Sequence, residues 1–318
     1  MSVQFRLNET IRKSTAWVKR DIFKPVFTSR AAWCFGTIWA IAAIYLVAIG
    51  RSSTVLLCLC AFAILMVLCV ITTAITRTEY KPKVKLSRTR QTLLLLQIGV
   101  IAFFICITLY TSLMFHGVVE RHLIPIWSPI IRAFEHLGEQ LFKSNIVGHP
   151  ALAMANPAKY FLLPLPFLLL LGARFSELGF RRGHRTWSIL ALWCFIPIGS
   201  WIFQLSFGYL SLSVLTRRWL SHLLMNGFGE EFLFRGALQT RLRALLNSSW
   251  AIVIQALLFG IWHFGANYKS MSINGATAVT AFCAVRTVFG LAYGIIFQRT
   301  RNLLACSVIH VVFNSLGG

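Results

Sequence analysis

The sequence predicts an all-α membrane protein, a polytopic bundle of about eight or nine transmembrane helices. Of its 318 residues, 57% are hydrophobic, and the mean hydropathy is +0.70. A soluble domain needs a large polar exterior and cannot hide so much apolar surface. Apolar runs of about 20 residues, each long enough to cross the hydrocarbon core of a bilayer, also recur along almost the whole chain. We therefore expect the lipid bilayer to be the solvent.

The apolar runs place the expected spans. They lie near residues 31–49, 54–75, 92–115, 158–173, 187–210, 215–237, 249–266, 276–297 and 303–317. The fourth and the last are short or interrupted by proline, which leaves the number at about eight or nine. A cleaved signal peptide has a shorter charged region than residues 1–30, a shorter apolar core than the first span and a small-residue cleavage site, so we expect the first span to remain as an anchor.

The charge of the chain is strongly basic. Lysine and arginine number 31 against nine acids, a formal charge of +22. In a soluble protein this excess would suggest a nucleic-acid partner. Here the basic residues collect in short loops such as 77–90 and 174–186, as they do on the cytoplasmic side of membrane proteins. With a cytoplasmic N-terminus these basic loops all fall on the cytoplasmic side, whereas the pair Arg217 and Arg218 is an exception on the outer side.

The sequence therefore predicts the lipid bilayer and membrane-associated proteins as partners. It predicts no nucleic-acid partner. The dense basic loops favour a bacterial inner membrane, although an endoplasmic reticulum membrane would show the same asymmetry.

Two parts of the chain differ in character. Residues 1–157 form an N-terminal membrane extension of three apolar spans and an outer loop, and no acid, base or histidine lies within those spans. In the loop, residues 126–142 carry apolar side chains at helical spacing, which indicates either an amphipathic helix on the membrane surface or an ordinary solvated helix. Residues 158–318 carry ionisable side chains inside their spans, so the chemistry is expected there.

Ionisable groups inside spans are the main functional signal. A charge at the centre of a membrane helix costs about 2.5–3.5 kcal/mol, so such residues usually face the bundle interior and have a function. The residues at this depth are Glu230, Glu231, His263, Arg286 and His310.

The two adjacent glutamates have different surroundings. Glu231 and Arg235 are four residues apart, so on a helix they share a face and can neutralise each other. Glu230 points about 100° away around the helix and stays available as a base. The alternative is that both carboxylates are held in structural pairs, with Arg286 as a second partner.

Two further helices carry polar pairs. Phe259 and His263 are one turn apart, and so are His310 and Asn314. Helical rise places Glu230, both histidines and Asn314 near the middle of a core about 30 Å thick. The alternative for each histidine is an ordinary interhelical hydrogen bond.

This set of groups suffices to hydrolyse an amide. A glutamate in a low-dielectric cavity can act as the general base for water, while an amide and an imidazole N–H stabilise the oxyanion. Alternatively, Glu230, His263 and His310 could bind a divalent metal such as zinc, so the cofactor is either zinc or none. The chain has no H-E-x-x-H, no G-x-S-x-G and no Asp after position 21.

These motifs resemble those of a known family. The three motifs follow one another on separate spans and are Glu230-Glu231-x-x-x-Arg235, Phe259-x-x-x-His263 and His310-x-x-x-Asn314. Their residues and their order are similar to the three motifs of the CPBP family of intramembrane proteases. That family comprises the type II CAAX prenyl endopeptidases and the bacterial Abi proteins. The resemblance covers roughly residues 158–318, which would be the catalytic membrane domain.

The resemblance implies an all-α intramembrane endopeptidase, either glutamate-type or metal-dependent. It assigns Glu230 and His263 to water activation, and His310 and Asn314 to the oxyanion site. Glu231 and Arg235 would be supporting residues.

We thus expect an endopeptidase that cuts a peptide bond in a membrane-associated protein or peptide. One alternative is a non-proteolytic immunity or binding protein with the same fold. Another is a proton-coupled transporter with Glu230, His263 and Arg286 as a relay, although matching broken spans in two halves are not evident.

Overall fold

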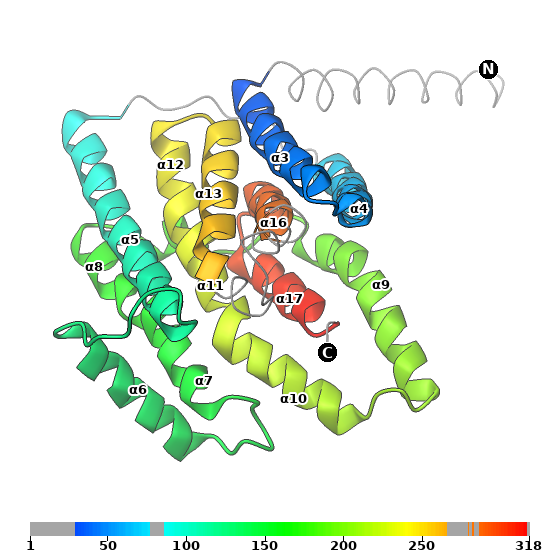
Figure 1. The fold of residues 1–318 in the computed structure, drawn as a ribbon. Coiled ribbons are helices and arrows are strands. Elements are labelled where there is room, and N and C mark those ends of the chain that lie inside the picture. The colour runs from blue at the N-terminus through cyan, green and yellow to red at the C-terminus, as the bar shows by residue number, and fades with distance from the viewer. Residues whose placement is uncertain (1–28, 77–85, 266–278, 280–281, 283–285, 317–318) are drawn as a thin grey trace, which may run out of the picture.

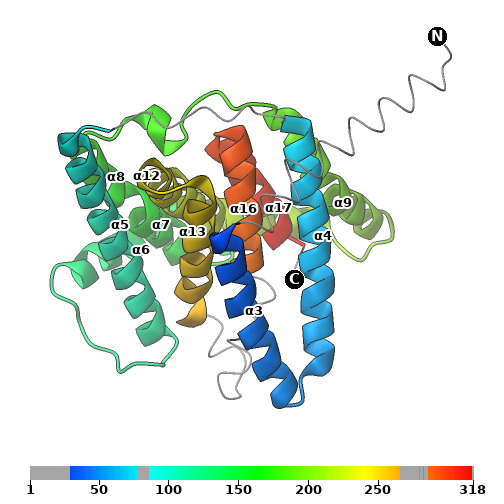
Figure 2. The same cartoon turned by 90° about the horizontal axis from the view of Figure 1, so that it is seen from above.

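The computed structural model describes residues 29–76, 86–265, 279, 282 and 286–316, and within them it is helical with no strand (Figures 1 and 2). The predicted all-α bundle is therefore confirmed. The α-helices are α3 (Arg30–Ala48), α4 (Ser52–Thr76), α5 (Arg88–Phe115), α6 (Trp127–Leu141), α7 (Pro150–Pro157), α8 (Pro164–Leu170), α9 (Thr186–Ser206), α10 (Leu212–His222), α11 (Gly229–Glu231), α12 (Thr240–Leu245), α13 (Ser248–Trp262), α16 (Thr287–Thr300) and α17 (Leu303–Asn314). Three π-helical segments, Ala158–Leu162, Leu223–Gly227 and Phe232–Gln239, and the 3-10 turn Phe175–Leu178 join them.

Within the described residues, five helices are long and apolar enough to cross a membrane. They are α3, α4, α5, the helix Pro150–Leu170 and α9, while α13 and α17 are shorter apolar helices. Large apolar side chains cover the outside of these helices, with Ile44 67%, Leu57 71% and Phe195 77% exposed. Such a surface would be costly in water and is expected in lipid. The chain is an integral membrane protein.

Most predicted spans have a counterpart, with shifted ends. The fourth begins at Pro150 and not near residue 158, because proline suits the first turn of a helix and a π-helical segment carries the chain past Pro157. The predicted domain boundary at 157 and 158 falls within this helix and stays a prediction. The predicted span 276–297 is described only in part, as α16, and residues 1–28 and 77–85, with much of the predicted basic sequence, lie outside the described residues.

The helix that carries the two glutamates is irregular. Two π-helical segments flank α11, and each widens the turn and changes which side chains share a face. Close packing accompanies these segments, since a Cβ on Gly227 would collide with the side chain of Val311 on α17. A Cβ on Gly236 would collide with the carbonyl oxygen of Leu178. The glycines therefore let α17 and the 3-10 turn approach the glutamate helix.

One hydrophobic core joins the N-terminal and C-terminal helices. It includes Ile101 and Phe104 of α5 together with Phe234, Phe259 and Ile309. Figure 1 shows α5 beside α12 and α13, and contacts between these helices agree with the picture. Helix α4 lies against α9 and α16 in the same way. The N-terminal helices thus pack directly on the helices that carry the candidate site.

The ends of several helices are tied by polar contacts. Arg90 of α5 pairs with Glu177 at 2.6 Å, and Arg241 of α12 donates to the Gln97 side chain at 2.8 Å. His184 Nε2 donates to the carbonyl of Thr76 at the end of α4 over 2.8 Å. The loop 174–186 therefore lies at the same end of the molecule as the start of α5 and the end of α4. This agrees with one common side for the basic loops, whose cytoplasmic placement stays a prediction.

The outer loop contains the predicted amphipathic helix. Helix α6 buries Trp127, Ile131 and Gly138 and packs along α7, so closely that a Cβ on Gly138 would collide with the carbonyl oxygen of Pro150. Leu141 remains 60% exposed on the other side. The helix is confirmed, and its position relative to the membrane surface stays a prediction.

Candidate active site

Glu231 is the partner of two residues. Both glutamates are buried on α11, Glu230 at 4% and Glu231 at 0% exposure. Arg235 donates to Oε1 of Glu231 at 3.0 Å, so the pair expected from the sequence is present. His310 Nδ1 lies 2.8 Å from the same oxygen. The Arg235 guanidinium is also 4.3 Å from the centre of the Phe259 ring. Glu231 thus pairs with Arg235 and orients His310 through the same oxygen.

The hydrogen bonds fix the protonated nitrogen of each histidine. A carboxylate and a carbonyl oxygen can only accept, so His310 Nδ1 donates to Glu231 and His263 Nδ1 donates to Phe259 O at 2.8 Å. In a neutral imidazole the other nitrogen then carries a lone pair. Each Nε2 is therefore an acceptor when its ring is neutral, and a donor only in the imidazolium.

Both Nε2 atoms face the same oxygen. His263 Nε2 lies 3.5 Å and His310 Nε2 3.9 Å from Oε2 of Glu230. This oxygen is buried and has no hydrogen-bond partner among the described residues. Three acceptor atoms around one buried point are unfavourable without a hydrogen or a cation between them. The arrangement therefore suits a proton, a water molecule or a metal ion.

Aromatic rings hold both imidazoles. His263 meets Phe259 at 4.5 Å and Trp262 at 4.9 Å between ring centres, both edge to face. His310 stacks on Tyr293 at 5.0 Å. In Figure 1 the helices concerned, α11, α13, α16 and α17, gather at the centre of the bundle. The rings restrict rotation, which keeps both Nε2 atoms directed at Glu230.

Asn314 and Arg286 are placed less directly. Asn314 is the last residue of α17, one turn beyond His310 and half-buried, and its amide makes no hydrogen bond to another described residue. Arg286 precedes α16, and its charge acts on Glu230 and His263 although it forms no ion pair with either glutamate. The structure thus brings Glu230, His263 and His310 together, with Asn314 on the same helix as His310.

The donor set also bears on the metal alternative. A carboxylate and two imidazole nitrogens are suitable zinc ligands, and the second nitrogens are held by a carbonyl and a carboxylate, as in many zinc sites. Among the described residues, however, no three His, Cys, Asp or Glu side chains are already grouped to hold a metal ion. The chemistry of Glu230, His263 and His310 fits zinc, without a preformed cage.

One polar neighbour was missed by the sequence analysis. His222 interacts electrostatically with Glu230 and His310, and its buried Nδ1 has no hydrogen-bond partner among the described residues. On a regular α-helix, residues eight apart are separated by about 12 Å along the axis, so His222 and Glu230 would not be expected to lie close together. The π-helical segment Leu223–Gly227 between them changes this relation. Only a prediction of the π-helix could have revealed it.

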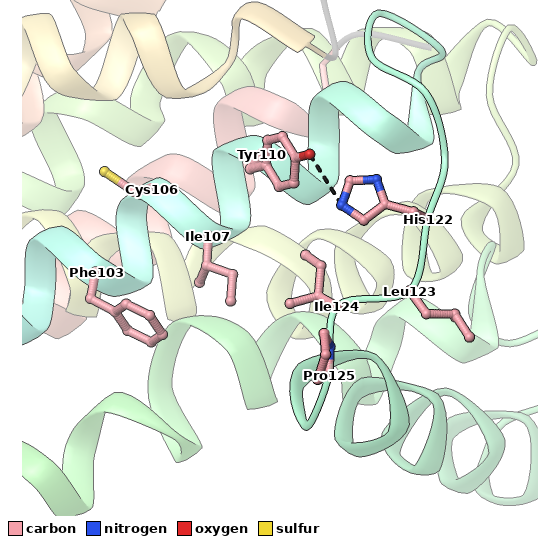
Figure 3. Close-up of a pocket in the computed structure, with 8 residues that line it drawn as sticks. All are labelled: Phe103, Cys106, Ile107, Tyr110, His122, Leu123, Ile124 and Pro125. Atoms are coloured by element: carbon pink, nitrogen blue, oxygen red, sulfur yellow. Dashed lines mark hydrogen bonds between the residues drawn. The ribbon is translucent and has the colours of Figure 1, made fainter.

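A separate cavity lies near the outer loop. It has a volume of about 390 Å³, is open, and is lined by Phe103, Cys106, Ile107, Tyr110, His122, Leu123, Ile124 and Pro125 (Figure 3). Tyr110 and His122 are joined across it by a hydrogen bond of 3.2 Å. None of the predicted site residues lines this cavity, so it is not the glutamate site.

Comparison with known proteins gives a family match for the C-terminal part of the chain. Residues 212–316 match the family described as type II CAAX prenyl endopeptidase Rce1-like. No curated protein and no solved structure matches the chain significantly. The matched residues run from α10 to the end of α17 and contain Glu230, His263 and His310. The resemblance to the CPBP family is thereby confirmed over these helices, which match an Rce1-like domain.

Proposed function

We propose that this protein is an intramembrane endopeptidase that hydrolyses a peptide bond in a membrane-associated protein or peptide. The family of residues 212–316 supports a protease. The observation that carries the proposal is the approach of two imidazole Nε2 atoms, at 3.5 and 3.9 Å, to one unsatisfied oxygen of Glu230. These are the groups that a hydrolytic water needs.

We assign the activation of water to Glu230 and His263. A water molecule between them donates one hydrogen to Oε2 of Glu230 and the other to Nε2 of His263. Glu230 takes its proton as the water oxygen attacks the carbonyl carbon of the substrate. The same proton then passes to the nitrogen of the leaving amine when the C–N bond breaks, which returns Glu230 to the carboxylate.

We assign stabilisation of the oxyanion to His310 and Asn314. His310 already donates through Nδ1 to Glu231, so it can donate to an oxyanion through Nε2 only as the imidazolium. The adjacent carboxylate of Glu231 stabilises that cation. The Asn314 amide, one turn further along α17, supplies a second donor. Arg235 acts indirectly, because it holds Glu231 in place.

The same donors define the metal alternative. Glu230, His263 and His310 would hold zinc, which would acidify a bound water. The substrate site would be unchanged, and so would the requirement for Glu230.

The substrate class and the location are part of the proposal. A C-terminal or membrane-proximal segment of a lipid-attached or membrane-spanning protein is the expected substrate, because we expect the helices that carry the site to lie in the bilayer. We place the protein in a bacterial inner membrane with its N-terminus in the cytoplasm, as the basic loops indicate.

The test compares the purified full chain with Glu230→Gln in liposomes. The probes are a fluorescence-quenched farnesylated peptide ending in a CAAX sequence and the same peptide without the lipid. Membrane proteomes of cells with either form are compared in parallel, since uncut precursors that accumulate with Glu230→Gln would name natural substrates. Glu139→Gln, on the exposed side of α6, is the matched control for loss of a carboxylate.

We expect cleavage by the wild type and by Glu139→Gln, and none by Glu230→Gln. Full cleavage by purified Glu230→Gln would overturn the proposal. Glu230→Gln cells that keep the biological activity of the wild type, with unchanged proteomes, would favour an immunity or binding protein. Proton-dependent uptake into the liposomes would favour a transporter.

A further inference from the structure

Helix α5 reaches the turn that carries His263. The indole Nε1 of Trp262 donates a hydrogen bond of 2.8 Å to Oγ1 of Thr108. Both residues are buried, Thr108 at 3% and Trp262 at 7% exposure. Thr108 lies outside residues 212–316, in the N-terminal part of the chain whose role the sequence leaves open. The contact therefore joins that part to the residue next to a candidate site histidine.

The Thr108 hydroxyl has a defined direction. Its own hydrogen is donated within α5, to Phe104 O at 2.6 Å or Ile105 O at 3.1 Å. The oxygen can then serve the indole only as an acceptor. Because Thr108 is β-branched and sits in a helix, its side chain has few rotamers. The acceptor is thus held rigidly in front of Trp262.

Trp262 in turn defines the position of its neighbour. The indole meets His263 at 4.9 Å with an angle of 85° between the rings, and Tyr160 at 5.0 Å with an angle of 78°. Phe234 covers it at 5.5 Å. If the indole rotated, the imidazole would lose one of the two rings that pack on it, the other being Phe259. The orientation of His263 toward Glu230 therefore depends on the indole.

A second contact from α5 lies just beyond His263. A Cβ on Gly265 would be 3.0 Å from Oγ of Ser112 and 3.1 Å from the backbone nitrogen of Leu113. The chain after His263 thus lies directly against the backbone of α5. Contacts at Trp262 and Gly265 bracket His263, and both come from the same helix.

We propose that Thr108 is a positioning residue for the hydrolytic reaction, holding Trp262 and through it the imidazole of His263 in line with Glu230. This inference rests on the proposed function and adds a residue of α5 to the site. A displacement of about 1 Å at a reacting group can lower a rate by about a hundredfold, so a partial loss of this constraint is expected to cost about tenfold.

The chain offers a matched control. Trp193 of α9 donates an indole hydrogen bond of 2.8 Å to Oγ1 of Thr72 on α4, and both residues are buried. Thr72→Val therefore removes the same kind of bond between an N-terminal helix and the C-terminal helices. Trp193 contacts Phe313 and neither candidate site histidine. Both variants lose a buried indole–hydroxyl hydrogen bond, but of the two indoles it is that of Trp262 that packs on a candidate site histidine.

The experiment measures cleavage of the farnesylated CAAX peptide by the full chain in liposomes, and the level of uncut precursor in cells. We expect Thr108→Val to lower kcat about tenfold with KM unchanged. Thr108→Ser, which keeps the hydroxyl, restores the rate. Thr72→Val keeps the wild-type rate. Equal kcat values for Thr108→Val and Thr72→Val would overturn the inference.

A second readout is independent of turnover. The ¹⁵N resonances of the His263 imidazole, measured in bilayers at one pH, should shift in Thr108→Val and stay in place in Thr72→Val. Trp262→Phe keeps a ring and removes the N–H, so it tests the same contact if Thr108→Val does not fold. Adding Thr108→Val to Trp262→Phe should cause no further loss of kcat, and an additive loss would show that Thr108 does not act through the indole.

The two proposals fail in different ways. If Glu230→Gln cleaves normally, the proposed function is wrong. If Glu230→Gln is inactive while Thr108→Val and Thr72→Val are alike in kcat and in the His263 resonances, only the positioning role is wrong.

Discussion

His310 Nδ1 lies 2.8 Å from Oε1 of Glu231, the oxygen that also accepts from Arg235. The second glutamate therefore serves as the anchor of the second histidine, whereas Glu230 keeps an oxygen free of hydrogen bonds within the described residues. Two adjacent and identical side chains thus have opposite environments. This difference leads to the first prediction.

Glu230→Gln and Glu231→Gln should separate activity from stability. Glu231→Gln leaves the fully buried Arg235 without its counter-charge, which costs about 3–5 kcal/mol for a broken buried pair. Glu230 has no such partner, so Glu230→Gln should abolish cleavage and leave the fold almost as stable as the wild type. Thermal unfolding in detergent, read beside peptide cleavage, checks both. Equal loss of stability in the two variants would contradict the assignment.

His263→Ala should abolish cleavage while the protein still inserts and folds. Among the described residues, the imidazole makes one hydrogen bond, to the carbonyl of Phe259, and it lies between rings that also pack on other residues. Membrane fractionation and size-exclusion chromatography check folding, and the peptide assay checks activity. An active His263→Ala protein would remove the imidazole from the proposed mechanism.

Asn314→Ala should lower kcat by about 10²–10³, as for loss of one oxyanion donor, with little change in stability. Asn302 at the other end of α17 provides the contrast, because its side chain caps the helix at Ala305 N over 3.2 Å. Asn302→Ala should cost about 1 kcal/mol of stability and leave kcat unchanged. The measurements are kcat and the unfolding midpoint. Asn314→Ala with wild-type kcat would exclude the amide from the oxyanion site.

Gly236→Ala should destabilise the protein by about 1–3 kcal/mol, because the new methyl group would collide with the backbone oxygen of Leu178. Gly199→Ala on α9 is the control, since no atom lies within 4 Å of a Cβ there. Replacing this glycine should be neutral or slightly stabilising, because alanine favours helix. Unfolding midpoints of the two variants give the comparison, and equal midpoints would contradict the close approach.

Metal removal tests the choice between a glutamate-type and a zinc-dependent site. The water mechanism on Glu230 and His263 predicts that cleavage continues at the same rate in 1,10-phenanthroline. Loss of cleavage that added zinc restores would instead assign Glu230, His263 and His310 as ligands. The isomer 1,7-phenanthroline, which does not chelate a metal, controls for effects of the compound on the membrane.

The sequence alone predicted the helical class and the membrane setting, which the structure supports, and it named the candidate site residues, whose roles stay predictions. These followed from local properties: apolar runs of membrane length, the cost of ionisable groups within them, and i to i+4 spacing, which predicted the pair of Glu231 with Arg235. The family of residues 212–316 agrees with the three motifs.

Only the tertiary structure decided how these residues divide their roles. The contact of His310 with Glu231, the two Nε2 atoms at Glu230 and the bond from Thr108 to Trp262 join residues 33 to 154 positions apart in the chain. No local pattern encodes such pairs, because they depend on how helices pack and on π-helical segments that alter which side chains share a face. The part of α5 beside the site was missed for the same reason.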